Sequence, residues 1–237
     1  MEVTKRRKPV SGSIRYSIRR HFVDGFFLKE VAALEAGGRV LDLGGNRTGK
    51  RGVFDIEKYD LEVIYGNLSD ARRPDVLLDA VSVPFVDSSV DAVICSELLE
   101  HVSEPKSVLT ESYRVLQQSG VLLISVPFLF HIHGDPKDYG RYTDSYWAEM
   151  LADAGFKEIE IRKQGLFWSV LMEMVRSIIC HLIARGRISG KLCRHCLSTV
   201  VYWGMKKALE VDARQTNQQD PFLASFTTGF GIKAVKA

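Results

Sequence analysis

Four short apolar segments, each ending in polar or glycine-rich residues, constrain the fold of this chain most. They cover residues 40–43, 61–65, 76–78 and 91–95, and their polar ends are Asp42 with Gly44, Asn67, Asp79, and Ser96 with Glu97. Short apolar runs bounded by turn residues favour buried strands. In an open sheet of such strands, ligands bind outside the carboxyl ends. The pattern therefore predicts an α/β sheet with a ligand site along one edge.

The rest of the pattern extends this sheet. Residues 14–34 have apolar side chains at helical spacing, and a second helix is predicted over residues 104–117, ended by Gly120. Residues 121–126 form a nearly all-apolar strand. Thr143 can cap a helix that runs through Ala154, with Gly155 as its stop. Two further strands are predicted at residues 156–161 and 231–235.

Length and composition set the domain organisation. With 237 residues, 46% of them hydrophobic, the chain can bury one sizeable core. We expect a basic tail and helix over residues 1–35, with disorder in the first 12, and a main domain over residues 36–237. A helical insertion over residues 166–210 precedes the last strand. Its apolar stripe is typical of core or of an oligomer face, and a membrane-surface role is disfavoured. We expect the insertion to form a lid, or the interface of a homodimer.

Charge and cysteine usage exclude several classes of protein. A net charge of +3 is too small to argue for nucleic acid by itself, although residues 1–20 are locally basic. Four cysteines in a chain of this size do not resemble a disulfide framework, so a reducing compartment is favoured. No apolar run follows the basic N-terminus as a signal peptide requires, and cytoplasmic localisation is the expectation. The longest apolar segment, residues 166–184, is interrupted by Glu173, Arg176 and His181, which disfavours a transmembrane span.

Cys193 and Cys196 are candidate ligands of a zinc site. Their CxxC spacing suits one ligand pair, but the second pair would be the adjacent Cys180 and His181, which cannot easily both chelate. No metal is expected from the sequence.

The segment 44–49 reads Gly-Gly-Asn-Arg-Thr-Gly and fits neither glycine-rich phosphate motif. Asp42, just before it, would repel a pyrophosphate but suits a cationic ligand. Asp79 could accept a hydrogen bond from an exocyclic amine. Each carboxylate alone could instead stabilise a turn. Together they favour a positively charged cofactor that carries a nucleoside.

Four motifs resemble those of class I S-adenosylmethionine-dependent methyltransferases, in the subgroup called methyltransferase domain 11. They begin at Val40, Asp79, Asp91 and Tyr113, and read VLDLGG, DA-x-x-x-PF, DAVICSELLEHV, and YRVL followed by Gly120. They fall in the family's order and spacing over residues 38–162. The resemblance implies a Rossmann-like, doubly wound, mostly parallel seven-stranded sheet with an antiparallel last strand.

The resemblance also assigns cofactor contacts. It implies that the backbone of Gly44, Gly45 and Asn46 holds the methionine part of S-adenosylmethionine, with Asp42 supporting the loop. Further contacts are expected from Asn67 to the ribose, Asp79 and Ala80 to the adenine, and Cys95 and Ser96 beside the amino group. The chain departs from the family in two places. Asn46 and Thr48 replace glycines, and Asn67 replaces an acid, which could weaken cofactor binding by ~1 kcal/mol.

The segment 127–143 is expected to face the acceptor. It contains His131, His133, Asp138, Arg141 and Tyr142, and resembles a His-x-x-Pro-x-Asp-Tyr-x-Arg-Tyr-Thr signature of bacterial methyltransferases in this subgroup. His133 is the first choice for a base, because imidazole accepts a proton near neutral pH. His101 and Asp138 are the alternatives, and Arg141 could clamp an anionic group. Alternatively, Asp138, Arg141 and Tyr142 form an ion-pair network that fixes the loop.

Three functions remain open on the sequence. The leading hypothesis is a methyltransferase acting on a small-molecule or glycan-like acceptor, with O-methylation expected. A nucleic-acid methyltransferase is the first alternative, and a cofactor-binding but inactive partner protein is the second.

Overall fold

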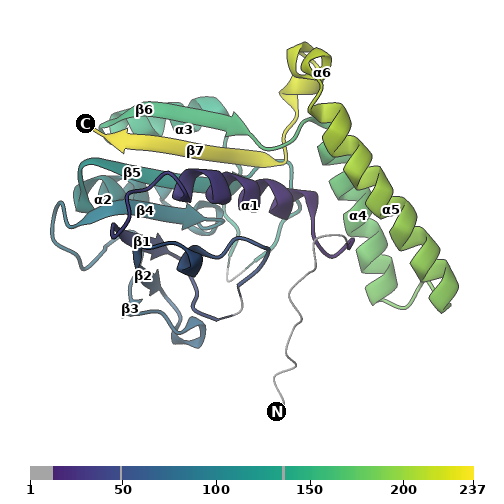
Figure 1. Cartoon of the computed structure of the whole chain (residues 1–237), viewed down its shortest axis with the longest axis horizontal. Coiled ribbons are helices and arrows are strands. Elements are labelled where there is room, and N and C mark those ends of the chain that lie inside the picture. Colours follow the sequence, from purple (N-terminus) through teal and green to yellow (C-terminus); the bar gives the residue numbers. More distant parts are fainter. Residues whose placement is uncertain (1–12, 49, 135–136) are drawn as a thin grey trace.

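A computed structural model describes residues 13–48, 50–134 and 137–237, so the predicted tail at residues 1–12 lies outside the described part (Figure 1). One seven-stranded sheet runs through the α/β body, in the order β3-β2-β1-β4-β5-β7-β6. Its strands are β1 Arg39–Leu43, β2 Glu62–Asn67, β3 Val76–Leu77, β4 Val90–Ser96, β5 Leu116–Pro127, β6 Phe156–Lys163 and β7 Gly229–Lys236. β7 is antiparallel to both neighbours and the other pairs are parallel. The predicted seven-stranded sheet is confirmed.

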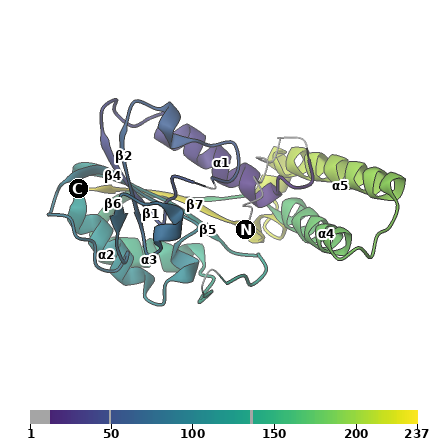
Figure 2. The ribbon, with the colours of Figure 1, turned by 90° about the horizontal axis from the view of Figure 1, so that it is seen from below.

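Helices cover the two faces of the sheet unequally (Figure 2). α1 (Ile18–Val31) lies on one face, while α2 (Pro105–Val115) and α3 (Asp144–Asp153) lie on the other. In the described chain, the connections from β1 to β2 and from β2 to β3 hold only the 3-10 turns η1 (Ile56–Lys58) and η2 (Asp70–Arg72). The apolar face of α1 therefore packs directly on the sheet, through Val23, Phe27 and Val31.

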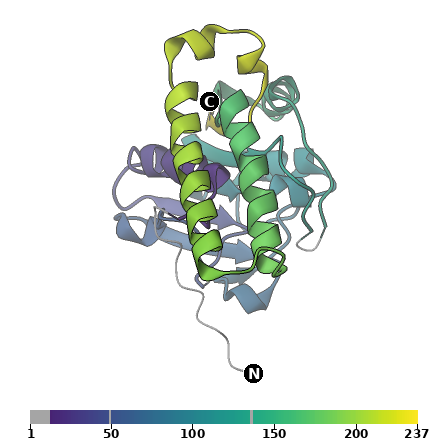
Figure 3. The ribbon, with the colours of Figure 1, turned by 90° about the vertical axis from the view of Figure 1, so that its right-hand side faces the viewer.

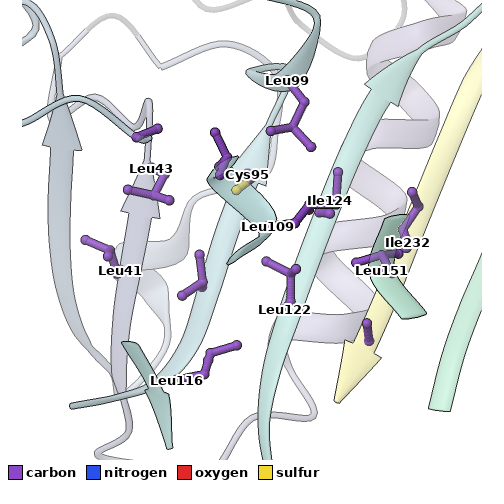
Figure 4. Packing of buried hydrophobic residues seen from close by; sticks show 14 of the residues in the cluster. Leu41, Leu43, Cys95, Leu99, Leu109, Leu116, Leu122, Ile124, Leu151 and Ile232 are labelled. Carbon is purple, nitrogen blue, oxygen red and sulfur yellow. The ribbon is translucent and has the colours of Figure 1, made fainter. Parts of the chain in front are cut away.

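The larger core lies between the sheet and the α2–α3 face. Leu41 and Leu43 of β1, Leu109 of α2 and Ile124 of β5 are completely buried there (Figure 4). Truncating one such leucine to alanine typically costs ~2–5 kcal/mol, because a cavity adds to the lost burial. This packing fixes the β1 and β4 ends, which are neighbours in register through Leu43 and Cys95.

One predicted boundary was wrong. α2 ends at Val115 and β5 begins at Leu116, so Gly120 lies inside the strand and does not end the helix. Leu116 already pairs with Val90, and the register shifts between Val90 and Ala92. A Cβ at Gly120 would come within 2.8 Å of the Gln117 carbonyl oxygen, so the glycine serves a close approach within this irregular start of the strand.

The insertion before β7 is a helical hairpin that projects from the body (Figures 1 and 3). α4 (Phe167–Ala184) and α5 (Lys191–Asp212) run antiparallel side by side, followed by α6 (Gln215–Gln219) and η4 (Leu223–Ser225). Glu173 of α4 accepts a hydrogen bond from the backbone N–H of Ile18 at the start of α1. Among the described residues, α4 alone is long and apolar enough to cross a membrane, with a mean hydropathy of 1.5, and 17% of it is buried.

Candidate functional site

The glycine loop after β1 is shaped by two close contacts. Gly44 has φ +77°, a left-handed conformation that glycine adopts at low cost. At Gly45, a Cβ would lie only 2.3 Å from Oδ2 of Asp42. The Asp42 carboxylate therefore packs beneath the loop, as the predicted supporting role requires. Alanine could not replace Gly45 without displacing this carboxylate.

Asn67, at the end of β2, holds the glycine loop through side-chain hydrogen bonds to its backbone. Its Nδ2 donates to the carbonyl oxygens of Gly44 (3.0 Å) and Gly45 (3.1 Å), while its Oδ1 accepts from the N–H of Ser69 (3.1 Å). The amide therefore uses both its donor and its acceptor groups on the backbone. A carboxylate could not donate to the two carbonyls.

Burial sets the charge state at Asp42. Desolvation raises its pKa to about 7, and the Lys50 ammonium opposes that rise by attraction. Lys50 itself pairs with Asp55 at 2.9 Å. A cationic group bound at the loop would favour the ionised form of Asp42 in the same way.

The other expected cofactor residues lie along the same edge of the sheet. Asp79 is exposed, and its Oδ1 accepts a hydrogen bond from the N–H of Val81 (3.2 Å). This is the geometry of a carboxylate that stabilises a turn, which is the alternative to a contact with the adenine. Ala80 is 7% exposed, and Ser96 is partly exposed at the end of β4. The Cys95 thiol points into the core beside Leu43 and is fully buried, so it could meet a ligand only through its backbone (Figure 4).

Sequence reasoning missed a buried polar network beside this edge. Arg19 of α1 donates to both carboxylate oxygens of Glu97 (Nη2–Oε1 2.5 Å), to Ser125 (3.0 Å) and to Gln164. Burial raises the pKa of Glu97, but the guanidinium outweighs it, so the net shift is downward. Nothing local in the basic N-terminal segment distinguished Arg19 from Arg15, which is exposed, or from Arg20, which is partly exposed. The network joins α1 to the ends of β4 and β5.

The segment 128–143 is held by an ion pair. Arg141 donates through Nη1 to Oδ1 (2.5 Å) and through Nη2 to Oδ2 (2.7 Å) of Asp138, whose side chain is only 4% exposed. The guanidinium lowers the pKa of Asp138 to about 2. Oδ2 of Asp138 also accepts from the backbone N–H of His133 (2.8 Å). This geometry suits a structural pair that positions His133.

His133 lies beside His101 and Glu100. The two imidazole rings meet edge to face, with centroids 5.2 Å apart, and His101 Nε2 is 3.7 Å from Oε1 of Glu100. Glu100 is 2% exposed, and burial together with the Glu97 charge raises its pKa to about 8. The sequence offered no signal for Glu100, because it lies within a motif that was interpreted only as a family signature.

A cavity of ≈ 600 Å³ opens between this segment and α4. Its walls are mainly apolar and include Phe128, Phe130, Met174 and Ile178, with His131 at one side. A second hollow, of ≈ 640 Å³, lies between the start of α2 and Tyr142 and Tyr146 of α3. Only the first contains a histidine of segment 128–143, so it is the candidate acceptor pocket.

Comparisons with known proteins agree with this geometry. A family model described as a methyltransferase domain matches residues 27–124. A demethylmenaquinone methyltransferase of Renibacterium salmoninarum is 36% identical over 75 residues, covering 30% of this chain and 32% of that protein. A probable S-adenosylmethionine-dependent methyltransferase of Mycolicibacterium smegmatis is 30% identical over 120 residues, covering 47% and 46%. The chain spans between about a third and three fifths of the length of such curated relatives.

The fold is shared with solved methyltransferases. The crystal structure of a SAM-dependent methyltransferase from Archaeoglobus fulgidus superimposes with a TM-score of 0.55 at 15% identity, over 92% of this chain and 94% of that one. The family match over residues 27–124, the Mycolicibacterium relative and this shared fold are three similarities to methyltransferases that use S-adenosylmethionine.

Proposed function

We propose that the chain transfers a methyl group from S-adenosylmethionine to a hydroxyl group of a small-molecule or saccharide acceptor. The carrying observation is the alignment of two features on one edge of the sheet: a glycine loop braced by Asp42 and Asn67, and a histidine-bearing segment that walls a cavity. Methyl transfer from a sulfonium requires the acceptor to lie in line with the breaking S–C bond. The cavity lined by His131 and by Phe130, whose ring contacts that of His133, would provide that position.

Its apolar walls favour an acceptor with an apolar portion. A purely polar sugar would leave several of its hydroxyls without partners against Phe128, Phe130, Met174 and Ile178. The named substrate of the Renibacterium relative, demethylmenaquinone, belongs to that protein. That relative's name supports a small-molecule acceptor for this chain.

His133 is proposed to act on the acceptor proton. Its Nδ1 lies 3.2 Å from the His131 carbonyl oxygen and 3.6 Å from Oδ2 of Asp138, so the ring is held by partners on one side. Asp138 is already paired with Arg141, which makes it a weaker candidate for the base, and Arg141 is proposed to fix the loop.

The four cysteines are present as free thiols, which supports a cytoplasmic location.

Calorimetry with S-adenosylhomocysteine tests the shared premise. The full chain should bind one equivalent, and Asp79→Ala should weaken binding if the carboxylate contacts the adenine amine. If the wild type does not bind S-adenosylhomocysteine, the proposal that this chain is an S-adenosylmethionine-dependent enzyme is contradicted.

Turnover over a panel of hydroxyl acceptors tests the second half of the proposal. His133→Ala should reduce turnover on a responsive acceptor by two orders of magnitude or so, leaving S-adenosylhomocysteine affinity unchanged. Equal activity in the variant would exclude His133. Cofactor binding without any methyl transfer would favour the inactive partner protein.

A further inference from the structure

Glu100, His101 and His133 converge in a cluster outside the proposed cofactor loop. Each offers one ligand atom, and these three atoms lie within 4.8 Å of one another. We propose that the three side chains bind a divalent transition-metal ion. The sequence pattern does not predict an ion here, because the three residues come from two separate segments.

The charge balance around the cluster leaves one carboxylate for a cation. Glu97 is paired with Arg19, and Asp138 is paired with Arg141. Glu100 is more deeply buried than either, at 2% exposed, yet neither of its carboxylate oxygens has a hydrogen-bond partner among the described residues. The charges of Arg141 and Glu100 attract each other, but Nη1 and Nη2 of Arg141 donate their hydrogen bonds to Asp138. Burying a carboxylate without a partner is costly, and a bound cation removes that cost.

Both histidines are oriented as metal ligands usually are. Nδ1 of His101 lies 2.5 Å from the carbonyl oxygen of Lys137, and Nδ1 of His133 lies 3.2 Å from that of His131. Donation of Nδ1–H to a carbonyl leaves the lone pair on Nε2. A ligating histidine is typically held through its other nitrogen in this manner, which fixes both the tautomer and the ring.

The donor set indicates which ions fit. Two imidazole nitrogens and one carboxylate oxygen suit Zn²⁺, Mn²⁺, Fe²⁺ or Co²⁺, whereas Ca²⁺ and Mg²⁺ prefer oxygen ligands. Three protein ligands leave positions open for an acceptor. The cluster borders the apolar cavity, because the ring of Phe130 meets that of His133 edge to face at 5.6 Å.

The role of the ion at the acceptor rests on the proposed function. An ion held here would bind an acceptor hydroxyl and lower its pKa, so that the proton leaves to water before the oxygen attacks the methyl carbon. The S–C bond then breaks and S-adenosylhomocysteine leaves. In this form of the proposed function, His133 acts on the acceptor proton through the ion that it holds, because a ligating imidazole nitrogen has no free lone pair with which to accept the proton directly.

Direct metal titration tests the site without cofactor or acceptor. Chelator-treated full chain is titrated with Co²⁺, recording visible absorption, and with Zn²⁺ in competition with a chromophoric chelator. We expect one equivalent of either ion. Glu100→Gln and His133→Ala should each weaken Zn²⁺ binding by about tenfold or more. Zinc should also raise the melting temperature of the wild type but not of Glu100→Gln.

Matched variants separate this site from adventitious binding. His181→Ala removes an exposed histidine of the same cavity, and Cys193→Ser with Cys196→Ser removes the CxxC pair. Both should retain wild-type Zn²⁺ affinity. Absence of binding by the wild type, or unchanged affinity in folded Glu100→Gln and His133→Ala, would overturn the proposal. Failure of S-adenosylhomocysteine binding alone would instead count against the proposed function.

A second inference follows from the charge of the helical hairpin. Residues 174–209 contain no aspartate or glutamate. Arg176 pairs with Glu173, and the other cations of this range are Arg185, Arg187, Lys191, Arg194, Lys206 and Lys207. Large apolar side chains are exposed on the same two helices: Leu171, Met174 and Ile178 on α4, and Leu192, Val200 and Trp203 on α5. We infer that the hairpin binds the surface of an anionic membrane.

This pairing of cations and exposed apolar groups favours lipid over the other occupants. Interfacial helices combine lysine and arginine with apolar and tryptophan side chains, as here at Trp203, whose ring lies 5.6 Å from Nζ of Lys206. A second copy of the hairpin would bring like charge to like charge. RNA would be attracted by the cations but would leave the apolar groups exposed.

Vesicle sedimentation tests this inference. The full chain should sediment with vesicles containing phosphatidylglycerol and not with pure phosphatidylcholine, and added salt should weaken the binding. Lys206→Glu with Lys207→Glu should reduce binding by about tenfold or more. The control Lys58→Glu with Lys157→Glu makes the same charge change at exposed positions of the body and should bind as the wild type. Binding to neither vesicle, equal loss in the control, or dimerisation or RNA binding in place of vesicle binding would overturn it.

Discussion

At the scale of single residues, Asn67 makes hydrogen bonds that an ionised carboxylate at the same position could not make. Its amide donates to two loop carbonyls and accepts from Ser69, so it joins the end of β2 to the glycine loop after β1. These three hydrogen bonds tie the amide to the geometry of the loop.

Replacing Asn67 by aspartate separates these two roles. If the amide holds the loop, the carboxylate would face two carbonyl oxygens, and S-adenosylhomocysteine affinity should fall by about tenfold or more, since each lost bond is worth ~1 kcal/mol. Asn67→Ala removes the bonds without adding repulsion and should show the smaller loss. Calorimetry measures both. A gain of affinity in the aspartate variant would mean that the residue contacts the ribose.

At the scale of elements, α1 borders the candidate site, because its residue Arg19 donates hydrogen bonds to Glu97, directly after β4, and to Ser125 of β5. Arg19 is 3% exposed and its partner Glu97 is 18% exposed. By contrast, Arg39 and Glu62 form a pair on β1 and β2 whose side chains are 47% and 58% exposed. The two pairs have similar chemistry and very different surroundings.

Urea denaturation should distinguish them. Arg19→Met leaves Glu97 buried without its cation and should lower the free energy of unfolding by ~3 kcal/mol or more. Arg39→Met, the matched control, should change it by less than ~1 kcal/mol. Similar small losses in both variants would mean that the network contributes little to stability.

The loop that carries His133 should lose its anchor in acid. Arg141 lowers the pKa of Asp138 to about 2, below its unfolded value of ~3.9, so this pair stabilises the fold above pH ~4. That contribution, ~2–3 kcal/mol, is lost as pH falls from about 4 towards 2. Unfolding measured across this range should be steeper for wild type than for Asp138→Asn. Asp153→Asn, on the exposed side of α3, should keep the wild-type slope.

At the scale of the whole molecule, the sequence predicted what depends on local pattern. The polar strand ends, Thr143 as an N-cap and the hairpin insertion follow from spacing and capping chemistry within a few residues. The contacts of Arg19 and Glu100 depend on where distant segments meet. The start of β5 was mispredicted because strand pairing with Val90 overrode a helical pattern that reaches residue 117. Tertiary packing decided each of these cases.

The ties of α1 also bear on how the chain folds. Arg19 reaches Gln164, a separation of 145 residues, and Glu30 pairs with Arg162 and Lys233. A Cβ at Gly229 of β7 would collide with the Arg19 guanidinium, so strand and helix form one tight junction. During synthesis α1 emerges long before β6 and β7 exist, and its apolar face has no complete sheet to cover. Contacts between residues so far apart in the sequence predict slow folding. They also predict that α1 depends on chaperones until β7 has been synthesised.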